Sequence, residues 1–62
     1  MELKFSTWQE VERYLQGSRT IVVPIGSTEQ HGPNGLVGTD ALCPEAIAIA
    51  LGEHTGALIA PT

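Results

Sequence analysis

Residues 20–40 read TIVVPIGSTEQHGPNGLVGTD, and this stretch decides the fold. Its first part, residues 20–25, is a short β-branched run that is typical of a strand buried in a parallel sheet. Pro24 has no N–H to donate to a sheet ladder, so we expect the strand to end there or to lie next to an edge. The glycines, Pro33 and Asn34 then predict a loop that leads to the next helix.

A helix is expected before this strand. Thr7 followed by Glu10 fits a capping box, in which the two side chains satisfy the first free backbone N–H groups of a helix. Trp8, Val11 and Leu15 then fall on one helical face, so we expect Trp8 to anchor a core or an interface. Gly17 is the expected stop, because glycine accepts the left-handed conformation that ends many helices.

The segment after the loop is ambiguous. Its AIAIAL run alternates as a strand does, but its length, its alanine content and the glycines at 52 and 56 favour a helix over residues 41–54. Apolar residues lie on two stripes of this helix, so we expect other parts of the protein to cover it on two sides. Residues 57–61, ALIAP, predict a second buried strand.

The expected order is helix, strand, loop, helix, strand. Strand–helix–strand in this arrangement is a βαβ unit, which is normally right-handed and part of a larger parallel sheet. The fold class is therefore α/β. We expect residues 1–62 to form the opening part of a single α/β domain.

Composition excludes several kinds of partner. Seven acidic against three basic residues give a net charge of −4 without a basic patch, so nucleic acid is not expected. No apolar run reaches the ~18 residues of a membrane span, and no signal peptide begins the chain. The single cysteine, Cys43, excludes an internal disulfide and fits a reducing, cytoplasmic location. We expect Cys43 to be a small buried residue.

The loop after the first strand holds the candidate site. In open parallel sheets, sites form at the carboxyl ends of the strands. Glu29 and His31 are two residues apart and, in an extended chain, point the same way roughly 6.5 Å apart. Asp40 begins the following helix and could reach both. Two carboxylates with one imidazole suit zinc or manganese, singly or as a pair of ions.

Other interpretations of this loop stay open. Glu29 and Asp40 are also ordinary solvated or helix-capping residues, and His31 an ordinary surface imidazole. A phosphate-binding loop is disfavoured, because no G-x-G-x-x-G or G-K-[ST] pattern is present and two acids would repel phosphate. A third class is a non-catalytic interaction fragment without metal, in which the helix over residues 41–54 docks onto a partner.

The residues themselves carry a resemblance. The run PIGSTEQHGP followed by GTD resembles the creatininase (creatinine amidohydrolase) family, over essentially the whole chain. The resemblance implies a three-layer α/β/α sandwich with a mostly parallel sheet, commonly assembled as a hexamer. It also implies a metal-dependent hydrolase that cleaves C–N bonds other than peptide bonds, often in cyclic amides, with a metal-bridged water and two zinc or manganese ions.

By this resemblance, Glu29 and His31 are ligands of different ions and Asp40 is the carboxylate that bridges them. The family often carries a second histidine where this chain has Asn34, a departure that puts creatinine itself in question as the small-molecule amide substrate. Further ligands, a histidine and a glutamate, come from beyond Thr62, so we expect these 62 residues alone to be inactive. The residues expected to orient the ligands are Ser27, Thr28, Gln30, Thr39 and Asn34.

Overall fold

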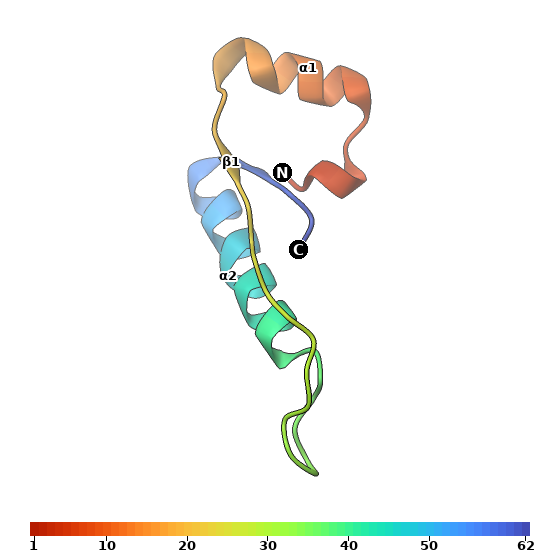
Figure 1. Ribbon diagram of the computed structural model, residues 1–62. Helices are drawn as coiled ribbons and strands as arrows, with labels where there is room; N and C mark the ends of the chain where they lie inside the picture. Colours follow the sequence, from red (N-terminus) through yellow and green to blue (C-terminus); the bar gives the residue numbers. More distant parts are fainter.

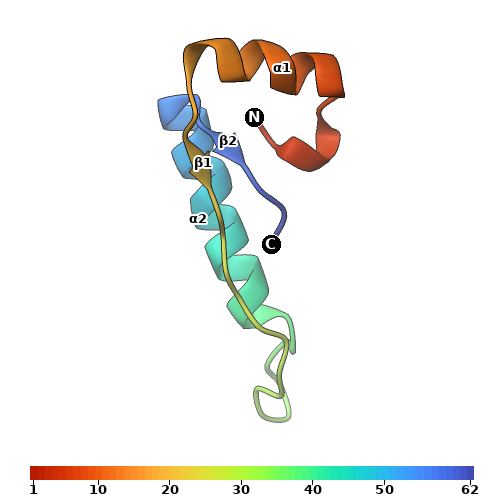
Figure 2. The ribbon, with the colours of Figure 1, turned by 45° about the horizontal axis from the view of Figure 1, so that its top comes forward.

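Two short parallel strands with a helix between them form the centre of the structure, a computed structural model that describes residues 1–62 (Figures 1 and 2). Strand β1 (Ile21–Val22) is followed by helix α2 (Thr39–Thr55) and strand β2 (Leu58–Ile59). Ile21 pairs with Leu58 and Val22 with Ile59, in parallel. The α/β class and the strand–helix–strand order predicted from the sequence are therefore confirmed.

Strand β2 is the buried strand because backbone lies on both of its sides. The Ala60 N–H donates to the Val22 carbonyl at 2.9 Å on the β1 side, and the Ile59 N–H donates to the Met1 carbonyl at 2.8 Å on the other. A parallel bridge joins Glu2 to Ile59. Leu58 and Ile59 are consequently only 4% exposed, as the apolar run at 57–61 predicts.

Strand β1 is shorter and more exposed than the sequence predicts. The ladder ends at Val22, because its next bond would need an N–H at position 24 and Pro24 has none. The expectation of a buried strand over residues 20–25 is wrong for this chain: Val23 is 57% and Ile25 81% exposed. No other part of the chain pairs with the outer edge of β1.

Helix α2 packs on the sheet through a small-residue contact. Ala48 and Gly52 are its buried residues, and a Cβ at Gly52 would lie 2.7 Å from Ile59 Cγ1. The absent side chain at position 52 thus lets the helix approach β2 closely. The helix ends at Thr55 and is capped by Gly56, whose φ of 76° is the left-handed conformation that glycine adopts without strain.

Both predicted apolar stripes of α2 carry residues that this chain leaves exposed. Leu42, on one stripe, is 52% exposed, and Ile47, on the other, is 69% exposed. Cys43 is exposed as well, against the expectation that it is buried. The helix is two residues longer at its start and one at its end than the predicted 41–54. Its type and position are as predicted, whereas the cover on two sides is absent.

Helix α1 (Trp8–Gly17) begins with the predicted capping box. The Glu10 N–H donates to the Thr7 hydroxyl at 3.3 Å, and the Thr7 N–H donates to the Glu10 carboxylate at 3.0 Å. The backbone and side-chain hydrogen bonds with Thr7 hold the pKa of the Glu10 carboxyl below its ordinary value. The helix ends at Gly17 as predicted, but the expected left-handed conformation is wrong: Gly17 stays helical, and the chain leaves through extended Ser18.

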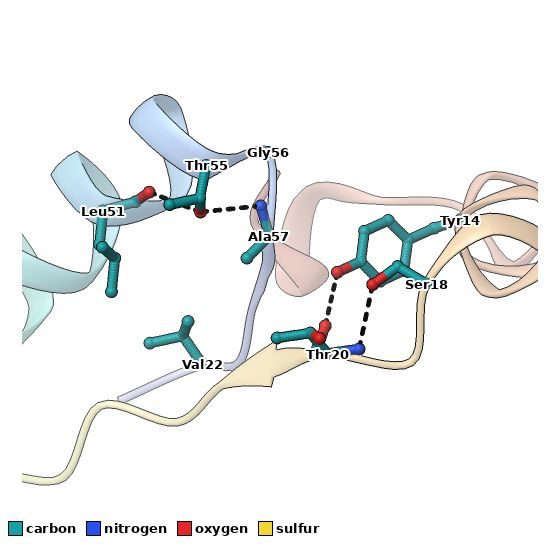
Figure 3. A pocket seen from close by; sticks show the side chains of 8 residues that line it. All are labelled: Tyr14, Ser18, Thr20, Val22, Leu51, Thr55, Gly56 and Ala57. Atoms are coloured by element: carbon teal, nitrogen blue, oxygen red, sulfur yellow. Dashed lines mark hydrogen bonds between the residues drawn. The ribbon is translucent and has the colours of Figure 1, made fainter.

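The apolar face of α1 is also exposed, so Trp8 anchors no core within this chain. The helix is tied to the sheet through Tyr14. Its hydroxyl donates to the Thr20 carbonyl (Figure 3) and accepts the Leu58 N–H at 3.0 Å. One 3-10 turn, η1 (Leu3–Phe5), precedes α1. It is tied to α2 by a 3.3 Å ion pair between Lys4 and Glu45.

The molecule is elongated, with α1 at one end and the loop between β1 and α2 at the other (Figure 1). Its extents are 47 × 21 × 13 Å and its radius of gyration is 13.9 Å, against about 11 Å for a compact chain of this length. Only five of 62 residues are buried. No helix has the length and apolar character needed to cross a membrane.

The close approach at Gly52 gives a stability prediction. We expect Gly52→Ala to lower the free energy of unfolding by about 1–3 kcal/mol, because the new methyl overpacks the Ile59 side chain. Gly17→Ala is the matched control, since nothing lies within 4 Å of a Cβ there. Urea denaturation followed by circular dichroism measures both. Equal stability of the two variants would contradict the packing of α2 on β2.

Candidate metal centre

The loop over residues 23–38 folds back on itself as a narrow ribbon before entering α2. Two backbone hydrogen bonds join its outgoing and returning arms: the Ser27 N–H donates to the Asp40 carbonyl at 3.3 Å, and the Glu29 N–H donates to the Val37 carbonyl at 2.9 Å. The outgoing arm, which carries Glu29 and His31, therefore runs beside the start of α2, which carries Asp40.

Two glycines let the backbones touch within this ribbon. A Cβ at Gly26 would collide with the Asp40 carbonyl oxygen and lie 2.7 Å from the Ala41 Cα. A Cβ at Gly35 would collide with the His31 carbonyl oxygen and lie 2.6 Å from the His31 Cβ. Any larger residue at either position forces backbone apart. Gly26 thus sets the position of Asp40, and Gly35 that of His31.

A proline inside α2 leaves the Asp40 carbonyl free for this contact. In a regular helix, that carbonyl would accept the N–H four residues later, at position 44. Pro44 has no N–H, so the helix offers no partner there. The Ser27 N–H takes the free acceptor instead. The first turn of α2 is thereby joined to the chain leaving β1.

Glu29, His31 and Asp40 come together as the sequence predicts. Each offers one ligand atom, and these three atoms all lie within 4.8 Å of one another. His31 Nε2 lies 3.2 Å from Asp40 Oδ2, which is hydrogen-bond distance. The imidazole is 32% exposed and the Asp40 carboxylate 47%, so both remain accessible to water and to a small ligand.

The cluster is rich in negative charge. Two carboxylates share the space with a single imidazole, and no lysine or arginine pairs with either of them. Lys4 pairs with Glu45, while Arg13 and Arg19 belong to α1 and the segment after it, at the far end of the molecule (Figure 1). A divalent cation is the ligand that this donor set and charge favour.

The five residues expected to orient the ligands have different surroundings. The Ser27 hydroxyl donates to Glu29 Oε1 at 3.3 Å. The Thr39 hydroxyl donates to the Leu36 carbonyl at 2.7 Å, so it fixes the returning arm and not a ligand. Side chains without a hydrogen bond to the cluster are those of Thr28, Gln30 and Asn34.

The alternative role of Asp40 as a helix cap is not what the structure contains. Gly38 is the N-cap residue of α2 and makes no side-chain capping bond. The Asp40 carboxylate is turned to His31. Its place in the first turn of α2 still puts negative charge at the positive end of the helix dipole, which is a stabilising position.

A cavity of about 390 Å³ lies at the opposite end of the molecule from the cluster, between α1, β1 and the end of α2 (Figure 3). Most of its hydroxyl groups are already hydrogen-bonded within the chain. Thr55 donates to the Leu51 carbonyl and accepts the Ala57 N–H, and Ser18 accepts the Thr20 N–H. It contains no acid, imidazole or thiol, so the candidate site remains the loop.

Fold and loop together define an α/β chain with a carboxylate–imidazole cluster after a parallel strand. The sequence model of the creatininase family, described as creatinine amidohydrolase, matches residues 4–62, and the chain belongs to this family. The chain is 38% identical over 56 residues to a creatinine amidohydrolase of Pseudomonas putida, which covers 89% of this chain and 22% of that protein.

A second relative is the 3-dehydro-scyllo-inosose hydrolase of Thermotoga maritima, which is 33% identical over 54 residues, or 87% of this chain and 17% of that protein. No solved structure matches the chain significantly. The chain thus spans about a fifth of the length of these two curated relatives. Both relatives are named as hydrolases, but the substrates in their names differ.

Sequence reasoning missed the residues that assemble the cluster. It treated Gly26 and Gly35 as general loop formers and gave Pro44 no role. A signal for Pro44 is present in the sequence, because a proline four residues after Asp40 must leave that carbonyl without its helical partner. No signal identifies Gly26 or Gly35 as contact residues, since that depends on how the two arms meet.

The contact between Gly26 and α2 is testable. We expect Gly26→Ala to push the outgoing arm away from the start of α2 and to break the bond from the Ser27 N–H to the Asp40 carbonyl. Amide hydrogen exchange measured by NMR should then show lost protection at Ser27, while the amides of α1 keep theirs. Unchanged protection at Ser27 would show that the two backbones do not meet as described.

Proposed function

We propose that this chain carries part of the metal centre of a metal-dependent hydrolase of the creatininase type, which cleaves a C–N bond in an amide, often a cyclic one. The observation that carries the proposal is the cluster of Glu29, His31 and Asp40, whose ligand atoms lie within 4.8 Å of one another. All three belong to the segment that matches the family. The hydrolase names of both relatives support the same general activity.

The donor set fits a pair of divalent ions. Two carboxylates and an imidazole suit zinc or manganese, and the uncompensated negative charge of the cluster favours cations. In the proposed arrangement, Glu29 and His31 bind different ions and Asp40 bridges them. Three side chains are too few for two ions, so the proposal includes further ligands, a histidine and a glutamate, elsewhere in the whole protein.

The proposed chemistry divides between the ions and the chain. Bound divalent ions supply Lewis acidity, which polarises a carbonyl and brings the pKa of water toward neutrality. The chain holds the donors: the ribbon fixes Glu29 and His31, and the first turn of α2 fixes Asp40. Because His31 and Asp40 are partly exposed, a water molecule and a small amide can both approach the cluster.

The substrate is proposed only as a class, a small-molecule amide. The loop tip at Asn34, where family members often carry a second histidine, argues against creatinine itself. We also propose a cytoplasmic homo-oligomer, hexameric by family resemblance. Exposed apolar residues on α1, β1 and α2 support this proposal, because another part of the whole protein or a neighbouring subunit could cover them. Examples are Trp8, Ile21 and Ile47.

A second candidate function rests on the exposed apolar stripe of α2 that Ile47 and Leu51 form, one helical turn apart. A non-catalytic fragment could use this side to dock onto a partner and would need no metal. It differs from the hydrolase in one measurable respect. Loss of Glu29, His31 or Asp40 would leave its metal content unchanged.

Three single substitutions test the metal centre. We expect Glu29→Ala, His31→Ala and Asp40→Ala each to lower the zinc or manganese bound per chain at least tenfold, because each removes one donor of the set. Metal is measured by elemental analysis after dialysis against a metal buffer. Glu12→Ala and His54→Ala are the matched controls, since they remove the same chemical groups outside the cluster.

The two candidate functions predict opposite results in this experiment. Metal loss in the cluster variants with normal content in both controls supports the hydrolase. Equal metal content in all five variants would instead support the interaction fragment, and the catalytic proposal would be withdrawn.

A further inference from the structure

Ser27 makes hydrogen bonds to two of the proposed ligand residues, one to the side chain of Glu29 and one to the backbone of Asp40. Its hydroxyl donates to Glu29 Oε1 at 3.3 Å. Its backbone N–H donates to the Asp40 carbonyl at 3.3 Å. Glu29 and Asp40 are eleven positions apart in the sequence. Ser27 therefore connects the outgoing arm of the loop, the first turn of α2 and the carboxylate that must face both His31 and Asp40.

We propose that Ser27 is a positioning residue for the metal centre: it holds the Glu29 carboxylate toward His31 and Asp40 and fixes the distance between the two arms. The inference rests on the proposed function in so far as the cluster binds metal. Ser27 contacts no ion in this proposal. It acts through Glu29, which is exposed and would otherwise rotate freely in water.

The hydroxyl bond leaves Glu29 well prepared to bind. Oε1 accepts a hydrogen bond from the Ser27 hydroxyl. Oε2 makes no hydrogen bond within the chain, so Oε2 remains free for a cation. A carboxylate that is already oriented loses less rotamer freedom when it binds. Hydrogen-bond partners of this kind typically change metal affinity by 10–100-fold when they are removed.

The backbone bond makes the position of Ser27 specific. It depends on the carbonyl that Pro44 leaves free and on the close approach at Gly26. The neighbouring Thr28 also carries a hydroxyl, but that hydroxyl makes no hydrogen bond within the chain. The Thr28 hydroxyl, one residue further along the chain, lacks the hydrogen bonds that Ser27 makes, so Thr28 provides a matched control.

The test compares three variants with the unsubstituted protein. Ser27→Ala removes the hydroxyl, Ser27→Thr keeps it, and Thr28→Val removes the neighbouring one. The zinc dissociation constant is measured by equilibrium dialysis against zinc chloride. We expect Ser27→Ala to weaken binding about 10–100-fold, Ser27→Thr to recover most of the loss, and Thr28→Val to bind as the unsubstituted protein does.

A second measurement decides the inference without metal. In the metal-free protein, we expect a nuclear Overhauser contact between the Glu29 side chain and the His31 ring, lost in Ser27→Ala and kept in Ser27→Thr. If the unsubstituted protein binds no zinc, the proposed function fails, while this contact still decides the role of Ser27. Unchanged zinc affinity or an unchanged contact in Ser27→Ala overturns the inference.

Discussion

The carbonyl of Asp40 is the group on which the candidate site depends. Pro44 removes its partner within α2, and Gly26 lets the chain leaving β1 lie directly against it. The Ser27 N–H then donates to it. This one backbone hydrogen bond thus connects the chain that leaves β1 to the first turn of α2. The Glu29 and Asp40 side chains lie close together because of this connection.

The rest of the chain forms only a small core around this connection. Strand β2 is buried because it has backbone neighbours on both sides, and α2 reaches it through Gly52. Elsewhere apolar side chains face outward, on α1, β1 and the far side of α2. Such exposure is large for a stable small domain and fits a family whose curated relatives are about five times longer.

Local patterns predicted much of the fold. The capping box at Thr7 and the helix after the loop are found, because each depends on neighbouring residues. The parallel strand pair is a long-range contact, and it was predicted from the strand–helix–strand order. Burial was predicted less well: β1 and Trp8 are exposed, since their apolar character needs cover that these residues do not supply. The grouping of the ligands followed from spacing and family resemblance. Their support by Gly26, Gly35 and Pro44 could not, because it depends on how two arms meet.

The central claim is that Glu29, His31 and Asp40 are ligands of a divalent metal centre. X-ray absorption at the zinc edge of the zinc-loaded protein tests it directly. The account predicts only nitrogen and oxygen neighbours, at about 2.0–2.2 Å, with an imidazole signature that His31→Ala weakens and His54→Ala leaves unchanged. A sulfur neighbour at about 2.3 Å would assign the ion to exposed Cys43 and contradict the account.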